Sequence, residues 1–341
     1  MKLLICTQVV DKNHPILGFF HGWITEFSKN FEEVHVICLF EGAHSLPENV
    51  HVHSLGKEDG ENRIKYIWRF YKYFWQLRQE YDVVFVHMNQ VYVIMGGIFW
   101  RIWHKKIGLW YMHRSVAGGL WLAEKLTNKI FTASKESFRL PSNKVIITGH
   151  GVDTQNFVMN HNLVKDVDLI SISRLSPSKN IEMAIESLRL IRKKISLTLT
   201  IIGGVNSDAE EQYKLKLERL IDEADLSDAV VFVGPVEHNK LPAWLGRAKV
   251  FMHTAMNGSL DKALLEPLLV GIPVVSSAEA AVALPLEEWH VGSAEEMAEA
   301  VIDIFQNDNS LKVKELQAFV LEKHSLKSLI PNISNELKTI P

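Results

Sequence analysis

The 341-residue sequence lacks several features that would assign it to a narrow class of protein. It has only two cysteines, Cys6 and Cys38, both in apolar strand-like runs, so we expect buried thiols in a reducing cytoplasm rather than disulfides. No apolar run is long enough to span a bilayer, and Met1 and Lys2 lead directly into the run LLICTQVV. We therefore expect neither a membrane-spanning helix nor a signal peptide.

Common catalytic and metal-binding motifs are also missing. No Cys/His cluster has zinc-ligand spacing, and the sequence contains neither a GxSxG nor a Walker motif. Asp166-Val-Asp168 has the form of a metal-binding DxD motif, but it leads into a buried strand, and we interpret it as the entry to that strand. We therefore predict no metal and no cofactor. No nucleic-acid-binding module is visible, so nucleic acid is not an expected partner.

The composition is that of an ordinary globular protein, but the charge is distributed unevenly. Hydrophobic residues make up 47% of the chain and charged residues 23%, and the length predicts two domains. Residues 1–160 contain 18 Lys and Arg against 14 Asp and Glu, and the remainder contains 19 against 26. Within the first half, residues 63–139 contain 13 basic and 4 acidic residues. The first half therefore presents a basic surface.

One segment of the first half, RIKYIWRFYKYFWQLR at 63–78, is both aromatic and basic. It has too many large apolar residues for a single buried face, and Trp100, Trp103, Lys105 and Lys106 continue the pattern. Tyr, Trp and basic residues together are typical of protein segments at a membrane interface. We therefore predict that residues 63–106 form a surface that binds peripherally to the inner face of the cell membrane. A core helix whose Lys and Arg side chains extend to solvent explains the same pattern.

Apolar strand-like runs alternate with helix-like segments through both halves. The predicted strands lie at 3–10, 34–40, 50–55, 82–88, 108–113, 129–134, 144–150, 168–173, 197–204, 230–234, 249–254 and 273–277. Continuous apolar strands separated by helices predict parallel sheets that are covered on both faces. We expect two doubly wound Rossmann-like α/β domains, residues 1–160 and 161–341, with the last helix as a candidate to pack back on the first.

The residues that follow these strands are the first candidates for a ligand site, because doubly wound sheets bind ligands beyond the carboxyl ends of their strands. They are rich in glycine, histidine and cations: Gly18, His87, His113, Arg174 to Lys179, Gly203-Gly204, Gly234 to Val236, and residues 257–261.

The loop SRLSPSKN, at 173–180, joins a buried strand to a helix. It brings the Arg174 guanidinium and the Lys179 ammonium close to the N–H groups of the following helix, an arrangement that suits a diphosphate. A solvated loop with Ser178 or Asn180 as the helix cap is the simpler alternative when the loop is taken alone.

The segment NGSLDKALLEPLLVGIPVV, at 257–275, combines a polar turn, a short apolar helix that ends at Gly271, and a strand after Pro273. Glu266 lies among the leucines of this helix, where it either faces solvent or binds a polar ligand. A carboxylate about two turns into such a helix can accept two ribose hydroxyls. The turn Asn257-Gly258-Ser259 adds backbone donors for an anion or a sugar hydroxyl.

In this order and spacing, four segments resemble the C-terminal domain of family 4 retaining glycosyltransferases: SRLSPSKN, TIIGG, VVFVGPVEHNKLPAWLGRAKVFMHT and LLEPLLVGIPVV. The first half resembles the family more loosely, through Gly18, VHMN, WYMH and GHGVDTQNF. The resemblance implies the GT-B fold, in which two Rossmann-like domains face each other across a cleft. It also implies a UDP- or GDP-sugar donor and metal-independent transfer to a hydroxyl of a glycan or lipid-linked acceptor.

The resemblance further implies roles for individual residues in binding the donor. Arg174 and Lys179 would bind its diphosphate, and Glu266 its ribose. Gly18 would let the N-terminal loop come close to the phosphates of the donor. Gly203 would also lie near the donor. The segment from Gly234 to Val236 would lie along the base.

Two histidines would complete the site. The resemblance implies that His113 is the active-site histidine near the donor sugar and the acceptor, and that His87 lies in the acceptor cleft. For both, a buried structural role is the alternative, because histidines at strand ends often only satisfy the backbone.

The sequence departs from the family at one position. The family has two glutamates eight positions apart, and the first would fall at Gly258. We predict that Asp261 replaces it and is catalytic together with His113; alternatively, the amides of Gly258 and Ser259 take its place. Other functions consistent with these residues are a nucleotide-sugar epimerase, a sugar-nucleotide-binding pseudoenzyme and a peripheral membrane module. A phosphorylase would need a pyridoxal lysine site, which we do not find.

Overall fold

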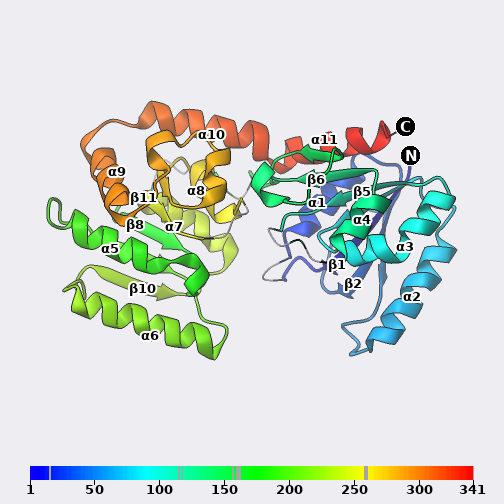
Figure 1. Cartoon of the computed structure of the whole chain (residues 1–341), viewed down its shortest axis with the longest axis horizontal. Helices are drawn as coiled ribbons and strands as arrows, with labels where there is room; N and C mark the ends of the chain where they lie inside the picture. The colour runs from blue at the N-terminus through cyan, green and yellow to red at the C-terminus, as the bar shows by residue number, and fades with distance from the viewer. Residues whose placement is uncertain are drawn as a thin grey trace. The chain divides into compact units, whose positions relative to one another are not determined.

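The computed structural model describes residues 1–14, 17–113, 116, 118–155, 157–158, 163–256 and 260–340 (Figure 1). The chain divides into two compact units, Met1–Asp153 with Lys323–Pro341, and Thr154–Glu322. The boundary between the units thus lies after Asp153, whereas the boundary expected from the sequence is residue 160. The end of the chain, from Lys323, is part of the first unit.

The first unit is built on a parallel sheet of seven strands in the described residues, in the order β3-β2-β1-β4-β5-β6-β7. The strands are β1 (Leu3–Val10), β2 (Val34–Glu41), β3 (Val50–Ser54), β4 (Val83–His87), β5 (Lys106–Trp110), β6 (Lys129–Thr132) and β7 (Val145–Ile147). The central strand β4, VVFVH, is buried along its whole length, as expected for a strand covered on both faces.

Helices cover both faces of this sheet. Residues of α2 (Arg63–Gln76), α3 (Gln90–Ile102) and α4 (Leu120–Leu126) join one apolar cluster that includes Val84 and Val86 of β4. On the other face, α1 (Phe20–Ser28) packs against α11 (Leu326–Lys338). Successive residues of β4 therefore point alternately to the two layers.

The last helix, α11, is tied to the first unit along its length. The amide of Val152 donates to the carbonyl of His324, and Lys338 Nζ donates to the carbonyl of Asn30 at 2.7 Å. Glu336 forms an ion pair with Lys129. Gly108 of β5 makes room for the helix, because a Cβ there would lie 2.5 Å from Leu337 Cδ2.

The second unit repeats the doubly wound design with five described strands, in the order β10-β9-β8-β11-β12. They are β8 (Val167–Ile172), β9 (Leu199–Ile202), β10 (Val230–Gly234), β11 (Ala248–His253) and β12 (Val274–Ser276). The helices are α5 (Ile181–Ile191), α6 (Asp208–Glu223), α7 (Leu241–Arg247), α8 (Lys262–Val270), α9 (Ala294–Gln306) and α10 (Ser310–His324). α5 contacts α6 and α9, whereas α7 contacts α8. The predicted fold class is confirmed.

Each sheet reverses its strand order at one point, between β1 and β4 in the first unit and between β8 and β11 in the second. In open α/β sheets such a switch point opens a crevice beyond the carboxyl ends of the strands, and ligands bind there. The loops after these four strands are therefore the expected location of a ligand site.

Candidate functional site

At the switch point of the second unit, the loops after β8 and β11 are joined by hydrogen bonds. Thr254 Oγ1 donates to the carbonyl of Lys179 at 2.7 Å, and the amide of Met256 donates to the carbonyl of Ser178 at 2.9 Å. These bonds fix the short 3₁₀ turn Pro177–Lys179 beside the entrance to α8. The backbone thus places Lys179 next to the segment that carries Asp261.

Lys179 and Asp261 form an ion pair, with 2.8 Å between Nζ and Oδ2. Asp261 is also the N-cap of α8, where its other oxygen accepts from the amide of Ala263 at 3.2 Å. Burial alone would raise the pKa of Asp261, but Lys179, His253 and these hydrogen bonds outweigh it and hold that pKa well below its usual range. The carboxylate is therefore ionised at neutral pH, and it holds the lysine in place.

Arg174, the other predicted cation, is largely exposed, with 63% of its side-chain surface accessible. Its Nη1 lies 3.5 Å from Glu210 Oε1, and Glu210 in turn accepts from the amide of Asn206 through Oε2 at 2.7 Å. The guanidinium thus lies beside the loop between β9 and α6, and most of its N–H donors are accessible to solvent.

The glycines at the ends of β9 and β10 bring the strand ends close together. A Cβ on Gly203 would lie 1.7 Å from the carbonyl oxygen of Ser173, so only glycine fits there. The Gly203 amide donates to the carbonyl of Gly234, which has φ +86°. Val236 follows, half-buried. The loop that carries Arg174 therefore packs directly on Gly203.

Glu266 is buried in α8, and only 7% of its surface is accessible. Its Oε1 accepts a hydrogen bond from His238 Nε2 at 2.9 Å. His238 opens the 3₁₀ turn His238–Lys240 that follows β10. The strand-end rule missed His238 because it stopped at Val236, although the histidine lies only two residues further on.

Gly258 and Ser259, predicted as donor-binding residues in the turn before α8, lie outside the described residues. The predicted helix end at Gly271 is confirmed, since Gly271 has φ +75° and caps α8 at its C-terminus.

At the switch point of the first unit, His87 is a core side chain. Its position at a strand end predicts a place in an acceptor cleft, but the structure leaves it only 2% accessible. Its ring stacks on Phe20 with 3.9 Å between centroids, and Thr7 Oγ1 lies 3.3 Å from Nδ1. It points to the same layer as Phe85, two residues earlier in β4. The structure therefore supports the structural alternative for His87.

His113 and Gly18 lie in loops of the first unit. β5 ends at Trp110, so His113 lies beyond the strand rather than at its last residue, and it is exposed. A Cβ on Gly18 would lie 2.6 Å from the carbonyl oxygen of His14, whose carbonyl also accepts from the Gly18 amide. The folding of its own loop is therefore a sufficient reason for glycine at position 18.

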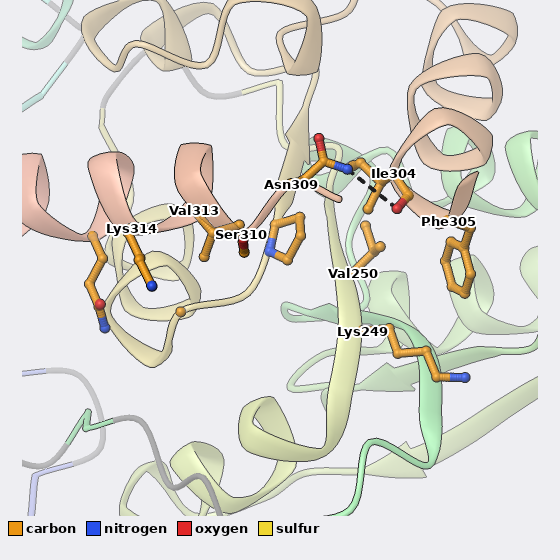
Figure 2. Close-up of a pocket in the computed structure, with 11 residues that line it drawn as sticks. Lys249, Val250, Ile304, Phe305, Asn309, Ser310, Val313 and Lys314 are labelled. Carbon is orange, nitrogen blue, oxygen red and sulfur yellow. Dashed lines mark hydrogen bonds between the residues drawn. The ribbon is translucent and has the colours of Figure 1, made fainter. Parts of the chain in front are cut away.

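A cavity of about 520 Å³ lies elsewhere in the second unit (Figure 2). Lys249 and Val250 at the start of β11, Pro273 just before β12, and the beginning of α10 line it. It is thus at the amino edge of the sheet, opposite to the edge that carries Arg174 and Lys179. In the part of the chain that the structure describes, no group of three His, Cys, Asp or Glu could hold a metal ion.

The architecture of the whole chain is that of the GT-B proteins. HepE from Anabaena, solved in complex with UDP, has a TM-score of 0.78 and 17% identity, and the match covers 99% of this chain and 100% of that one.

Residues 153–317, nearly the whole second unit, match the model of the family of glycosyl transferases group 1. The amylovoran biosynthesis glycosyltransferase AmsK of Erwinia amylovora is 30% identical over 146 residues, which is 40% of this chain and 34% of that protein. The putative colanic acid biosynthesis glycosyltransferase WcaL of Salmonella typhimurium is 28% identical over 42% of this chain and 36% of its own length. The matched segment thus spans about a third of these relatives.

Proposed function

We propose that the protein is a glycosyltransferase that moves a sugar from a UDP- or GDP-sugar to a hydroxyl group of a glycan or lipid-linked acceptor, with retention and without a metal. The observation that carries the proposal is the polar switch point of the second unit. There, two cations and a buried carboxylate lie beyond the ends of β8 and β11, in the segment that matches the family of glycosyl transferases group 1. The relatives AmsK and WcaL are named as glycosyltransferases, and HepE was solved with UDP, which supports a nucleotide-sugar donor.

In this proposal the second unit binds the leaving nucleotide. Arg174 and Lys179 neutralise the charge that develops on the diphosphate as the glycosidic bond breaks, the task a metal ion performs in other enzymes. Asp261 holds the Lys179 ammonium in position through their ion pair, and Glu266 accepts the ribose hydroxyls. We place His113 near the donor sugar and the acceptor because the resemblance to the family implies this position.

A thermal-shift screen with UDP, GDP and ADP tests the donor class, followed by a transfer assay with the sugar nucleotides of the diphosphate that binds. Arg174→Ala and Lys179→Ala should each abolish transfer while the protein stays folded. Arg189→Ala is a matched control, because Arg189 pairs with Glu186 on α5, within a single helix. Unimpaired turnover in the Arg174 and Lys179 variants, or no shift with any diphosphate, would contradict the proposal.

Gly258, where the family has its first glutamate, favours one further function, a pseudoenzyme that binds sugar nucleotides without transferring the sugar. Such a protein would bind the donor but release no nucleotide when acceptor is added. An epimerase would instead isomerise the donor without any acceptor. The transfer assay therefore separates the three activities.

We also propose that the first unit docks on a membrane through an aromatic face formed by α2, α3 and α4. On α2 and α3 the exposed apolar residues recur three, four or seven positions apart, so they form stripes. The exposed apolar residues are Ile64, Ile67, Trp68, Tyr71 and Trp75 on α2, Val91, Ile98, Phe99 and Ile102 on α3, and the adjacent Trp121 and Leu122 on α4. The buried residues of α2 are Phe70 and Phe74, so the exposed stripe is not needed to form the core.

Contacts between α2 and α3 join their stripes, and the charged residues within these two helices are all basic. Tyr71 of α2 donates to the carbonyl of Met95 in α3, and its ring contacts Phe99. Neither α2 nor α3 contains an acidic residue, whereas Arg63, Lys65, Lys72 and Arg101 are basic. Glu124 of α4 is buried and hydrogen-bonded to Ser142. Exposed aromatic residues among cations fit an anionic lipid surface.

Sedimentation with lipid vesicles tests the aromatic face. The protein should bind vesicles with anionic phospholipid more than zwitterionic ones, and Trp68→Ser with Trp75→Ser should remove most of that binding. Leu311→Ser is the control, since Leu311 is exposed in the second unit. Equal binding by the double variant and the control would contradict the docking surface. Within the described residues no helix is long and apolar enough to cross a membrane.

A further inference from the structure

The contact between His238 and Glu266 is the starting point for an inference about how the protein recognises a ribose. Only 9% of the Glu266 side chain is accessible, whereas 61% of the His238 side chain is. A buried carboxylate requires a hydrogen-bond donor, and His238 supplies it from the solvent side. The imidazole therefore lies on the solvent side of the buried Glu266 carboxylate.

The hydrogen-bonding pattern determines what Glu266 can still do. An ionised carboxylate only accepts, so Nε2 of His238 carries the hydrogen of the 2.9 Å bond to Oε1. The carboxylate retains Oε2 and one lone pair of Oε1 as acceptors. The His238 ring is supported by Phe157, whose centroid lies 5.1 Å away. The bond thus fixes the plane of the carboxylate and leaves its remaining acceptors for two hydroxyl groups.

We propose that His238 is a positioning residue that orients Glu266 toward the vicinal hydroxyls of a ribose. Together the two residues make the protein selective for ribonucleoside over deoxyribonucleoside diphosphates. The inference rests on the proposed function, because it takes the nucleotide of the donor as the ligand. It adds that the selectivity for ribose depends on a residue of the turn after β10 as well as on α8.

A purely structural role for His238 predicts something different. If the imidazole only satisfied a buried carboxylate, His238→Ala would lower stability and weaken all nucleotides alike. If it orients Glu266, the variant loses the distinction between ribose and deoxyribose. The ratio of two dissociation constants separates these roles, because a general loss of folded protein cancels in the ratio.

The experiment is calorimetric titration of the wild type with UDP, or with GDP if only GDP binds, and with the corresponding 2′-deoxy compound. One hydrogen bond to a charged group corresponds to about 10- to 100-fold in affinity, so the wild type should prefer the ribose form by that factor. His238→Ala should reduce the preference to about threefold or less. His238→Gln, whose amide can donate to Glu266, should restore part of it.

Lys240→Ala is the matched control, because Lys240 lies in the same 3₁₀ turn but pairs with Glu237. It should keep the full preference. An unchanged preference in a folded His238→Ala variant would overturn the inference, as would a wild type that binds both forms equally. Both of these results leave the proposed function standing. If no nucleoside diphosphate bound the wild type, the inference and the proposed function would fail together.

Discussion

The two units have the same kind of switch point but fill it with different chemistry. Beyond β8 and β11, the second unit places paired charges, Lys179 with Asp261, and a buried carboxylate on the next helix. At the end of β4, the first unit places the buried ring of His87 against the rings of Phe20 and Trp23. Topology therefore determines where a crevice opens, but the side chains at that point decide whether it binds a polar ligand.

The difference extends to the surfaces of the two units. The first unit carries the basic excess and exposes aromatic stripes, whereas residues 161–341 carry an excess of acidic residues, 26 against 19. We infer a division of tasks in which the second unit binds the nucleotide of the donor and the first unit meets the membrane and the acceptor. The following predictions test this comparison, from the largest expected effect to the smallest.

Gly203→Ala should be the most damaging of these substitutions. The new Cβ would meet the backbone of Ser173 at 1.7 Å, and backbone cannot move aside as a side chain can. We expect a loss of about 3 kcal/mol or more in the free energy of unfolding, measured by urea denaturation. Gly18→Ala, at 2.6 Å from the carbonyl of His14, should cost less, and Gly118→Ala, with nothing within 4 Å, should be neutral. Equal stabilities would contradict the close packing beneath Arg174.

Acid should destabilise both units. Burial lowers the pKa of His253 to about 4, with Asp261 raising it and Lys179 lowering it, and burial also lowers the pKa of His53 and His324 to about 4. The unfolded chain binds protons below pH 6.5 while these folded sites do not, so stability falls from pH 6.5 to about pH 4 and then levels off. Fully buried His253 alone accounts for up to about 3 kcal/mol.

Urea denaturation across this pH range checks the effect. His253→Leu should reduce the slope of the free energy of unfolding against pH, because the substitution removes one of the three histidines that produce it. A slope equal to that of the wild type would show that His253 takes no part in the acid effect.

Lys179→Ala should lower stability as well as remove transfer, because it takes the ammonium partner away from the partly buried Asp261. We expect a loss of about 2 kcal/mol in the free energy of unfolding. Adding Asp261→Ala should recover part of this stability without recovering transfer. A double variant less stable than Lys179→Ala would show that the cap on α8 matters more than the ion pair.

His87→Ala should have the smallest effect on the donor site. Loss of the ring that stacks on Phe20 should cost about 1–2 kcal/mol of stability, and the affinity for nucleoside diphosphate should not change. Unfolding curves and calorimetric titration measure the two quantities. Unchanged stability combined with a large fall in turnover would instead support a role for His87 in the acceptor cleft.

The sequence was sufficient to predict the strands, the doubly wound class and the candidate positions, because apolar runs and strand ends are local signals. The sequence could not show which of these polar residues contact each other. Lys179 and Asp261 are 82 residues apart, and His238 and Glu266 are 28 apart, so their contacts exist only in the folded unit. For His87 a local signal was present: it shares a face of β4 with Phe85, which indicates packing against α1 rather than a cleft.

The most direct test of the account is calorimetric titration of UDP and GDP into the wild type and into Arg174→Ala. The central claim is that a nucleoside diphosphate binds at the switch point of the second unit. It predicts that one of the two binds the wild type at micromolar concentration and binds Arg174→Ala about tenfold more weakly or worse. Binding of equal strength in both proteins, or no binding to the wild type, would contradict the claim.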